Sequence, residues 1–137
     1  MKLDPSAFVG DPALISTLEE HCSSISCGED RILFSQGENP KGLYILNQGR
    51  ITLTMTSSTG EQVVSVDASA GSLLGLPGLI SGEPYTLTAT AHGGAQLSFV
   101  PRGEVTSLMQ SNPLLAIKML QVLAAELRSA RHALSNL

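Results

Sequence analysis

The sequence predicts a mainly β protein with a helix on each side of the strands. Between Ser24 and Val100, short segments rich in β-branched and apolar residues alternate with turns that contain Gly, Pro, Asn or Ser. In residues 12–22 and 112–137 the apolar residues instead recur at helical spacing. This order predicts an antiparallel β-barrel or sandwich at 24–100, an N-terminal helix and a long C-terminal helix.

Size and composition are typical of one folded domain covering residues 1–137. The chain has 42% hydrophobic and 15% charged residues, and a mean hydropathy of +0.17, which favours an ordered globular protein over a disordered one. Eight basic and twelve acidic residues leave a net charge of −4. Because Lys and Arg form no dense run that could follow a phosphate backbone, we expect no direct nucleic-acid binding.

The sequence also indicates a cytoplasmic protein. The longest mostly apolar stretch, residues 113–127, is interrupted by Lys118, Gln121 and Glu126, so it is too short for a membrane span. The first twelve residues contain Asp4 and prolines where a secretory signal would have a continuous apolar segment. We therefore expect neither a membrane segment nor secretion.

The helices and strands have recognisable boundaries. Asp11-Pro12 and Asn112-Pro113 are typical helix starts, because Asp or Asn can accept hydrogen bonds from free backbone N–H groups and Pro suits the first helical position. Segment 51–56 alternates apolar residues with threonines, which predicts a strand with one buried face. Turns at 57–60 and 92–94 predict hairpins, the second of which follows a strand at 85–91. A short helix is expected to end near Met109.

The C-terminal helix carries apolar residues at alternating spacings of four and three, which is the pattern of a coiled-coil seam. We expect its first turns, with Leu114, Leu115 and Ile117, to pack on the barrel. Beyond them, polar residues flank a narrower stripe, which predicts a homodimer through residues 120–137. The seam residues are Ala116, Leu120, Leu123, Leu127, Ala130, Leu134 and Leu137, and those from Leu120 onward form the predicted dimer interface.

The segment RILFSQGENPKGLYILNQGRITL resembles the start of the cyclic-nucleotide-binding domain family, as found in catabolite-activator and fumarate-nitrate-type bacterial regulators. The matching positions are Phe34, Gly37, Leu43, Tyr44, Ile45, Leu46, Gly49 and Ile51. Gly71, Leu74, Gly75 and Asn112-Pro113 extend the likeness over roughly residues 12–137. The resemblance implies a double-stranded β-helix (jelly-roll) barrel, a long C-terminal dimerisation helix and a non-catalytic sensor role in transcription regulation or signal transduction.

The resemblance also implies where a ligand would bind. In members that bind cyclic AMP or cyclic GMP, a glutamate contacts the ribose and an arginine pairs with the cyclic phosphate. Leu76 occupies the glutamate position and Tyr85 the arginine position, whereas Thr86 matches a small hydroxyl residue that touches the phosphate. Because a buried phosphate needs a cation or full hydrogen bonding, a cyclic nucleotide is disfavoured as cofactor and an atypical ligand, or none, is expected.

The candidate pocket contains Gly75, Leu76, Tyr85, Thr86, Ala130 and Arg131, the last two because the family's terminal helix touches the base. Two of these residues have a second interpretation. Arg131 can equally be a solvated flank of the seam. Tyr85 can be a core residue whose hydroxyl needs a partner, or a surface residue.

Two alternatives to a sensor with an atypical ligand stay open at this point. One is a ligand-free dimerisation or protein-interaction module whose pocket is filled by its own side chains. Another is a redox or haem sensor that uses Cys22, Cys27 and His92, although two cysteines are too few for an iron–sulfur cluster or a tetrahedral zinc site. We expect no metal site and no enzyme, since no catalytic motif stands out. The regulators' helix-turn-helix is also missing from these residues, so DNA binding would need a longer parent or a partner.

Overall fold

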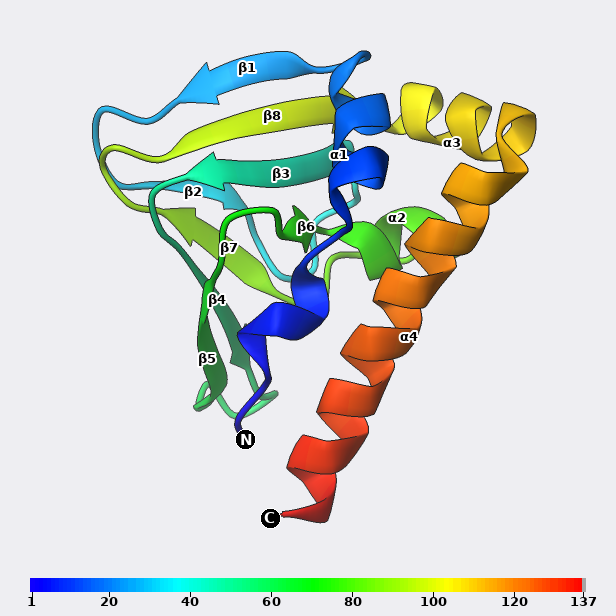
Figure 1. Cartoon of the computed structure of the whole chain (residues 1–137). Coiled ribbons are helices and arrows are strands. Elements are labelled where there is room, and N and C mark those ends of the chain that lie inside the picture. The colour runs from blue at the N-terminus through cyan, green and yellow to red at the C-terminus, as the bar shows by residue number, and fades with distance from the viewer. Residues whose placement is uncertain (137) are drawn as a thin grey trace.

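A computed structural model describes residues 1–136 and contains two four-stranded antiparallel sheets packed face to face, with helices along one side (Figure 1). The helices are η1 (Pro5–Phe8, a 3₁₀ helix), α1 (Pro12–Glu19), α2 (Leu76–Ser81), α3 (Arg102–Ser111) and α4 (Pro113–Ser135). The strands are β1 (Ser23–Ser26), β2 (Arg31–Phe34), β3 (Gly42–Gln48), β4 (Ile51–Thr56), β5 (Gln62–Ala68), β6 (Leu73–Leu74), β7 (Thr88–Ala91) and β8 (Gln96–Pro101).

The strand orders are β1-β8-β3-β6 and β2-β7-β4-β5, so chain neighbours often lie in different sheets. This arrangement is a jelly roll and confirms the predicted fold class. In β4, Ile51 and Leu53 are fully buried whereas Thr52 and Thr54 are half-buried, as the alternation predicts. Within the described residues, no helix is long and apolar enough to cross a membrane.

Side-chain caps begin the two helices whose starts the sequence predicted. The Leu14 N–H donates to Asp11 Oδ1 at 2.7 Å, and the Leu115 N–H donates to Asn112 Oδ1 at 3.1 Å. Each cap satisfies a backbone donor that has no partner inside the helix. The two caps therefore fix the residues at which α1 and α4 begin.

The apolar residues form two clusters. The first lies between the sheets and includes Phe34, Leu46, Leu53, Leu74 and Tyr85. The second joins the β1-β8-β3-β6 sheet to the helices, and contains Leu14, Leu18, Leu43, Ile45, Leu73, Leu76, Leu79, Val100, Val105, Leu115, Met119 and Val122. In this second cluster, α4 contributes Leu115, Met119 and Val122, which all lie in its first three turns.

The local structure differs from the predictions in three places. Strand β7 begins at Thr88, so residues 85–87 are not part of the predicted strand 85–91. The segment before it holds the short helix α2, which was not among the predicted helices. Strand β1 was also not predicted, because its sequence, SSIS, has no alternation of apolar and polar residues. It pairs with β8 at the edge of its sheet.

The orientation of α4 corrects the expectation for its first turns. Leu115 is buried as expected, but Leu114 and Ile117 are 64% and 52% exposed, so the prediction that they pack on the barrel was wrong. The sheet-facing residues are Leu115, Met119 and Val122, with Ala133 buried further along. Of the seam residues, Leu120, Leu127 and Leu134 are exposed, Ala116, Leu123 and Ala130 are half-buried, and Leu137 lies outside the described residues.

Two glycines with positive φ provide a test of the packing between β3 and the turn before β8. Gly49 (φ +93°) would place an added Cβ 2.7 Å from Ala95 Cα, whereas Gly60 (φ +89°) faces open space. Alanine at either position must adopt a left-handed conformation, which costs about 1–2 kcal/mol. Only Gly49→Ala also creates a backbone clash. We predict that Gly49→Ala lowers the free energy of unfolding by about 1–3 kcal/mol more than Gly60→Ala in urea denaturation; equal losses would contradict this packing.

Candidate functional site

A small cavity lies at the place where the two sheets meet α2 and α4. Its volume is about 30 Å³, which is room for about one water molecule. It is lined by Phe8, Phe34, Leu53, Leu74, Gly75, Pro77, Gly78, Tyr85, Thr86, Leu87 and Glu126. The cavity therefore brings together η1, β2, β4, the β6–α2 turn, the segment before β7, and α4.

Tyr85 occupies most of the space beside Gly75. Its hydroxyl donates to the Gly42 carbonyl at 3.0 Å and accepts from the Lys41 N–H at 3.3 Å, and its ring stacks on Phe34 at 4.0 Å between centroids. A Cβ on Gly75 would meet Tyr85 Cε1 at 2.6 Å, so this glycine makes room for the ring. Burial raises the pKa of the Tyr85 hydroxyl. The side chain is thus a hydrogen-bonded part of the core, which is the first of its two sequence interpretations.

The structure brings together only part of the predicted pocket. Gly75, Tyr85 and Thr86 line the cavity, but Leu76 does not: it is fully buried in the cluster that joins the helices to the sheet. Ala130 is half-buried and Arg131 is exposed, and neither lines the cavity. That these residues contact a ligand stays a prediction.

The residue of α4 that does face the cavity is Glu126, which the sequence reading missed. Neither carboxyl oxygen is accessible to solvent, and neither has a hydrogen-bond partner among the described residues. Burial raises the pKa of this carboxyl to about 8. The signal was present in the sequence: Leu115, Met119, Val122 and Glu126 follow a spacing of four, three and four, which is one helix face.

The cavity contains no side chain that could pair with a phosphate. Of its lining residues only Glu126 is acidic, and none is Lys, Arg or His. The hydroxyl of Tyr85 is already committed to the backbone of β3 and the residue before it. The remaining side-chain donors are the Thr86 hydroxyl and, while it is protonated, the Glu126 carboxyl. An anionic ligand would consequently meet one weak donor and one carboxyl group.

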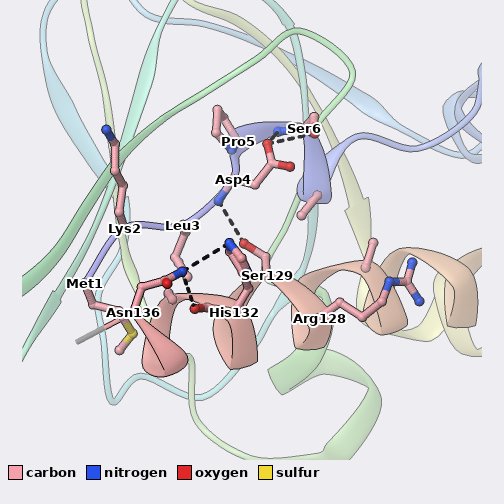
Figure 2. A pocket seen from close by; sticks show the side chains of 13 residues that line it. Met1, Lys2, Leu3, Asp4, Pro5, Ser6, Arg128, Ser129, His132 and Asn136 are labelled. Carbon is pink, nitrogen blue, oxygen red and sulfur yellow. Dashed lines mark hydrogen bonds between the residues drawn. The ribbon is translucent and has the colours of Figure 1, made fainter.

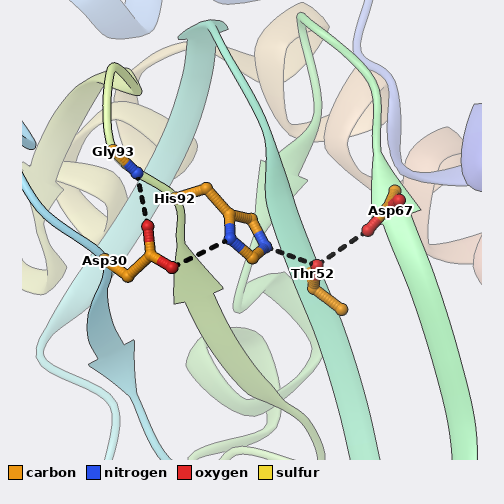
Figure 3. A network of polar contacts seen from close by, with 5 residues as sticks. All are labelled: Asp30, Thr52, Asp67, His92 and Gly93. Atoms are coloured by element: carbon orange, nitrogen blue, oxygen red, sulfur yellow. Dashed lines mark hydrogen bonds and ion pairs between the residues drawn. The ribbon is translucent and has the colours of Figure 1, made fainter.

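A second polar cluster surrounds His92 and ties strands together (Figure 3). Asp30 accepts from the Gly93 N–H at 2.7 Å and lies 3.5 Å from His92 Nδ1, while His92 Nε2 is 2.7 Å from the Thr52 hydroxyl, which donates to Asp67 at 2.7 Å. These contacts connect the 92–94 turn to β4 and β5. Within residues 1–136 no group of three or more His, Cys, Asp or Glu could hold a metal ion, and both cysteines are free thiols.

A wide groove separates the N-terminal segment from the end of α4 (Figure 2). Its two walls are joined by the Asp4 N–H, which donates to Ser129 Oγ at 2.8 Å, and Asp4 also caps η1 through Ser6. Arg128, His132 and Lys2 lie along it. The Asp4–Ser129 bond joins the two walls of the groove, whereas the contacts between Asn136 and His132 lie within the end of α4.

Comparison with known proteins identifies the family. The sequence profile of the cyclic nucleotide-binding domain matches residues 24–112. The chain therefore belongs to the cyclic nucleotide-binding domain family, whose members are regulatory domains. Two curated relatives are lysophospholipases, from Neurospora crassa (24% identity) and Chaetomium globosum (23%), each over 118 residues. These alignments cover 86% of this chain and only 8% of each relative.

Solved structures of bacterial regulators share the fold. The catabolite activator protein of Thermus thermophilus superposes with a TM-score of 0.79 at 23% identity, covering 96% of this chain and 62% of that one. The sensor domain of the regulator DNR from Pseudomonas aeruginosa gives 0.67 at 19% identity, covering 89% and 82%. The c-di-GMP responsive regulator CLP of Xanthomonas campestris gives 0.69 at 16%, covering 90% and 63%. At these identities the likeness shows the fold.

The buried carboxyl of Glu126 makes stability depend on pH. Its pKa is about 8 in the folded protein, against 4.5 as the ordinary value, so between these values the folded state holds a proton that the unfolded state has lost. The free energy of unfolding should therefore fall as the pH rises from about 5 to 8, by up to about 1.4 kcal/mol per pH unit from this group.

We predict that Glu126→Gln removes this decline, as measured by urea denaturation from pH 5 to 9. Glu20→Gln is the matched control, because Glu20 is exposed at the end of α1, and it should keep the wild-type pH dependence. If wild type and Glu126→Gln have parallel pH profiles, the carboxyl is not buried as described.

Proposed function

We propose that this chain is a homodimeric, non-catalytic sensor domain of the cyclic-nucleotide-binding type, with a pocket that does not accept an ordinary cyclic nucleotide. The proposal places it in the cytoplasm, as part of a transcription-regulating or other signalling system. Its single most important support is the state of Tyr85: at the position where the resemblance implies a phosphate-binding arginine, the phenol fills the space and bonds to the Gly42 carbonyl.

The energetics of the pocket support this restriction. Burying a phosphate without a cation or full hydrogen bonding costs several kcal/mol, and an arginine supplies two parallel charge-assisted bonds that a phenol cannot replace. The nearby carboxyl of Glu126 adds repulsion whenever it is ionised. Binding would also require Tyr85 to leave its stacked position on Phe34. Each of these contributions makes the free energy of binding a cyclic nucleotide less favourable.

The exposed stripe on α4 supports a homodimer. Leu120, Leu127 and Leu134 are 53%, 59% and 56% exposed at intervals of seven residues, and apolar residues at this spacing pair in coiled coils. Leu123 and Ala130 are half-buried beside them. A second copy of α4 would cover the stripe, so we assign the dimer interface to Leu120, Leu123, Leu127, Ala130, Leu134 and Leu137.

The position of α4 gives the dimer a route to sensing. Glu126 faces the cavity, and Leu127, the next residue, belongs to the exposed stripe. A ligand that changes the contact at Glu126 would bias the rotation or tilt of α4 and so the geometry of the paired helices. The sensing step is therefore a shift between two helix positions with different affinities for the ligand.

The second candidate function is a ligand-free dimerisation or protein-interaction module. The observation that favours it is the small size of the cavity. Aromatic side chains occupy most of the space, and the free volume that is left, about 30 Å³, has room for about one water molecule. The two functions share the dimer and differ in the response to small molecules.

Ligand-induced stabilisation separates the two functions. A ligand that binds only the folded state at one hundred times its dissociation constant adds about 2.7 kcal/mol of apparent stability. We predict no change in Tm with millimolar cyclic AMP or cyclic GMP, and an increase with at least one compound in a panel of small anions, cations and neutral molecules. An increase with a cyclic nucleotide would contradict the proposed restriction, and no response across the panel would favour the interaction module.

The dimer is tested by placing a charge in the exposed stripe. We predict that wild type sediments at twice the 14.3 kDa chain mass at micromolar concentration, and that Leu127→Lys sediments as a monomer because like charges would face each other in the seam. Gln121→Lys is the control, since Gln121 is exposed on α4 outside the stripe, and it should remain dimeric. A monomeric wild type, or a dimer that survives Leu127→Lys, would contradict the assigned interface.

A further inference from the structure

The cavity is lined by aromatic rings and one carboxyl group. Phe8, Phe34 and Tyr85 come from three different segments, and the Phe34 and Tyr85 rings are stacked at an interplanar angle of 27°. Glu126 approaches from α4. The remaining lining residues are apolar, glycine or threonine. Aromatic faces attract cations through their quadrupole, and proteins use aromatic cages for ammonium ligands.

The carboxyl of Glu126 lacks the partners that buried carboxyls normally have. Both oxygens are inaccessible to solvent and without a hydrogen-bond donor among the described residues, although most buried polar atoms in folded proteins are paired. An unpaired buried polar group costs about 1–3 kcal/mol. No water-sized sphere reaches either oxygen in this structure, so a donor in the cavity would bond to the carboxyl after a turn of the Glu126 side chain, which lines the cavity. That contact would recover the free energy of the unpaired group.

Charged side chains on α4 and on or beside the helices that pack against it are paired with one another. Lys118, earlier on α4, pairs with Asp11 at 3.0 Å, and His21 pairs with Glu104 of α3 at 3.2 Å. On η1, the carboxyl of Asp4 accepts from Ser6. Tyr85 is the other titratable side chain that lines the cavity, and its pKa is raised. Burial is the one cause of the raised pKa of Glu126, so no protein cation competes with a ligand there.

We propose that this cavity is a binding site for a small primary or secondary ammonium ion, whose N–H groups donate to Glu126 while its charge lies against the Phe34 and Tyr85 rings. The inference deepens the proposed function, because it assigns a chemical class to the occupant of the same pocket. The volume of about 30 Å³ suits an ammonium head group, and any longer alkyl part would leave beside Thr86, which is exposed at the rim.

Binding releases a proton. The neutral carboxyl of Glu126 loses its proton to solvent as the ammonium ion enters, and the resulting carboxylate accepts the N–H bonds of the ligand. Because the carboxyl has a pKa of about 8, one molecule in about eleven is ionised at pH 7 and ten in about eleven at pH 9. An alkylammonium, like the lysine ammonium, keeps its proton to about pH 10. Affinity should therefore increase about tenfold between pH 7 and pH 9.

The test is an NMR titration of the whole chain with methylammonium chloride, with potassium chloride at equal ionic strength as the reference. The observed signals are the Glu126 side-chain carboxyl carbon and the methyl groups of Leu53 and Leu87, which line the cavity. We expect saturable shifts of all three with methylammonium, an affinity about tenfold higher at pH 9 than at pH 7, and at least tenfold weaker binding of tetramethylammonium, which has no N–H donor.

Variants assign the effect to the carboxyl. Glu126→Gln preserves the size of the side chain and removes its charge. The Leu53 and Leu87 methyl signals show whether this variant is folded, and they should no longer shift with methylammonium. Glu20→Gln, at an exposed position, should bind as wild type does. The inference is overturned if methylammonium and potassium give equal shifts, if affinity does not change with pH, if tetramethylammonium binds as well, or if Glu126→Gln retains binding. The proposed function is judged by the dimer and by the response to the wider panel. A failure of the ammonium site would therefore not contradict it.

Discussion

The position of Tyr85 between the two sheets is the constraint on which the site depends. Its hydroxyl bridges the Gly42 carbonyl and the Lys41 N–H, and its ring stacks on Phe34, so one side chain joins the segment before β7 to β3 and β2. Gly75 has no side chain where the ring needs space. The phenol therefore fills the space where the sheets and helices meet.

Filling this space with a neutral side chain changes the electrostatics of the pocket. Without a cation, the cavity offers little to a phosphate, and the one ionisable group that enters from α4 is an acid, Glu126. The same carboxyl lies next to Leu127 of the exposed stripe. The carboxyl in the pocket and the exposed stripe are thus neighbouring features of a single helix, which is why a sensor function and a dimer are proposed together.

Turn glycines, strand alternation and helix caps such as Asp11 and Asn112 are local signals, and they predicted an antiparallel β structure with flanking helices; the family resemblance implied the jelly roll. The rotation of α4 could not be read in the same way: this helix has apolar residues on several faces, and only the sheet selects Leu115, Met119 and Val122 over Leu114 and Ile117. Glu126 was missed for the same reason, since a glutamate on an amphipathic helix is usually solvated. Whether Tyr85 is a core or a surface residue could not be predicted, because its hydrogen-bond partners, the backbone of residues 41 and 42, are distant in the sequence.

The most direct measurement of the central claim is a crystal structure of the chain grown with millimolar cyclic AMP. The account predicts that the Tyr85 ring still stacks on Phe34, that its hydroxyl still bonds to Gly42, and that no nucleotide lies between the sheets and α4. A nucleotide bound there, with Tyr85 displaced into solvent, would contradict it.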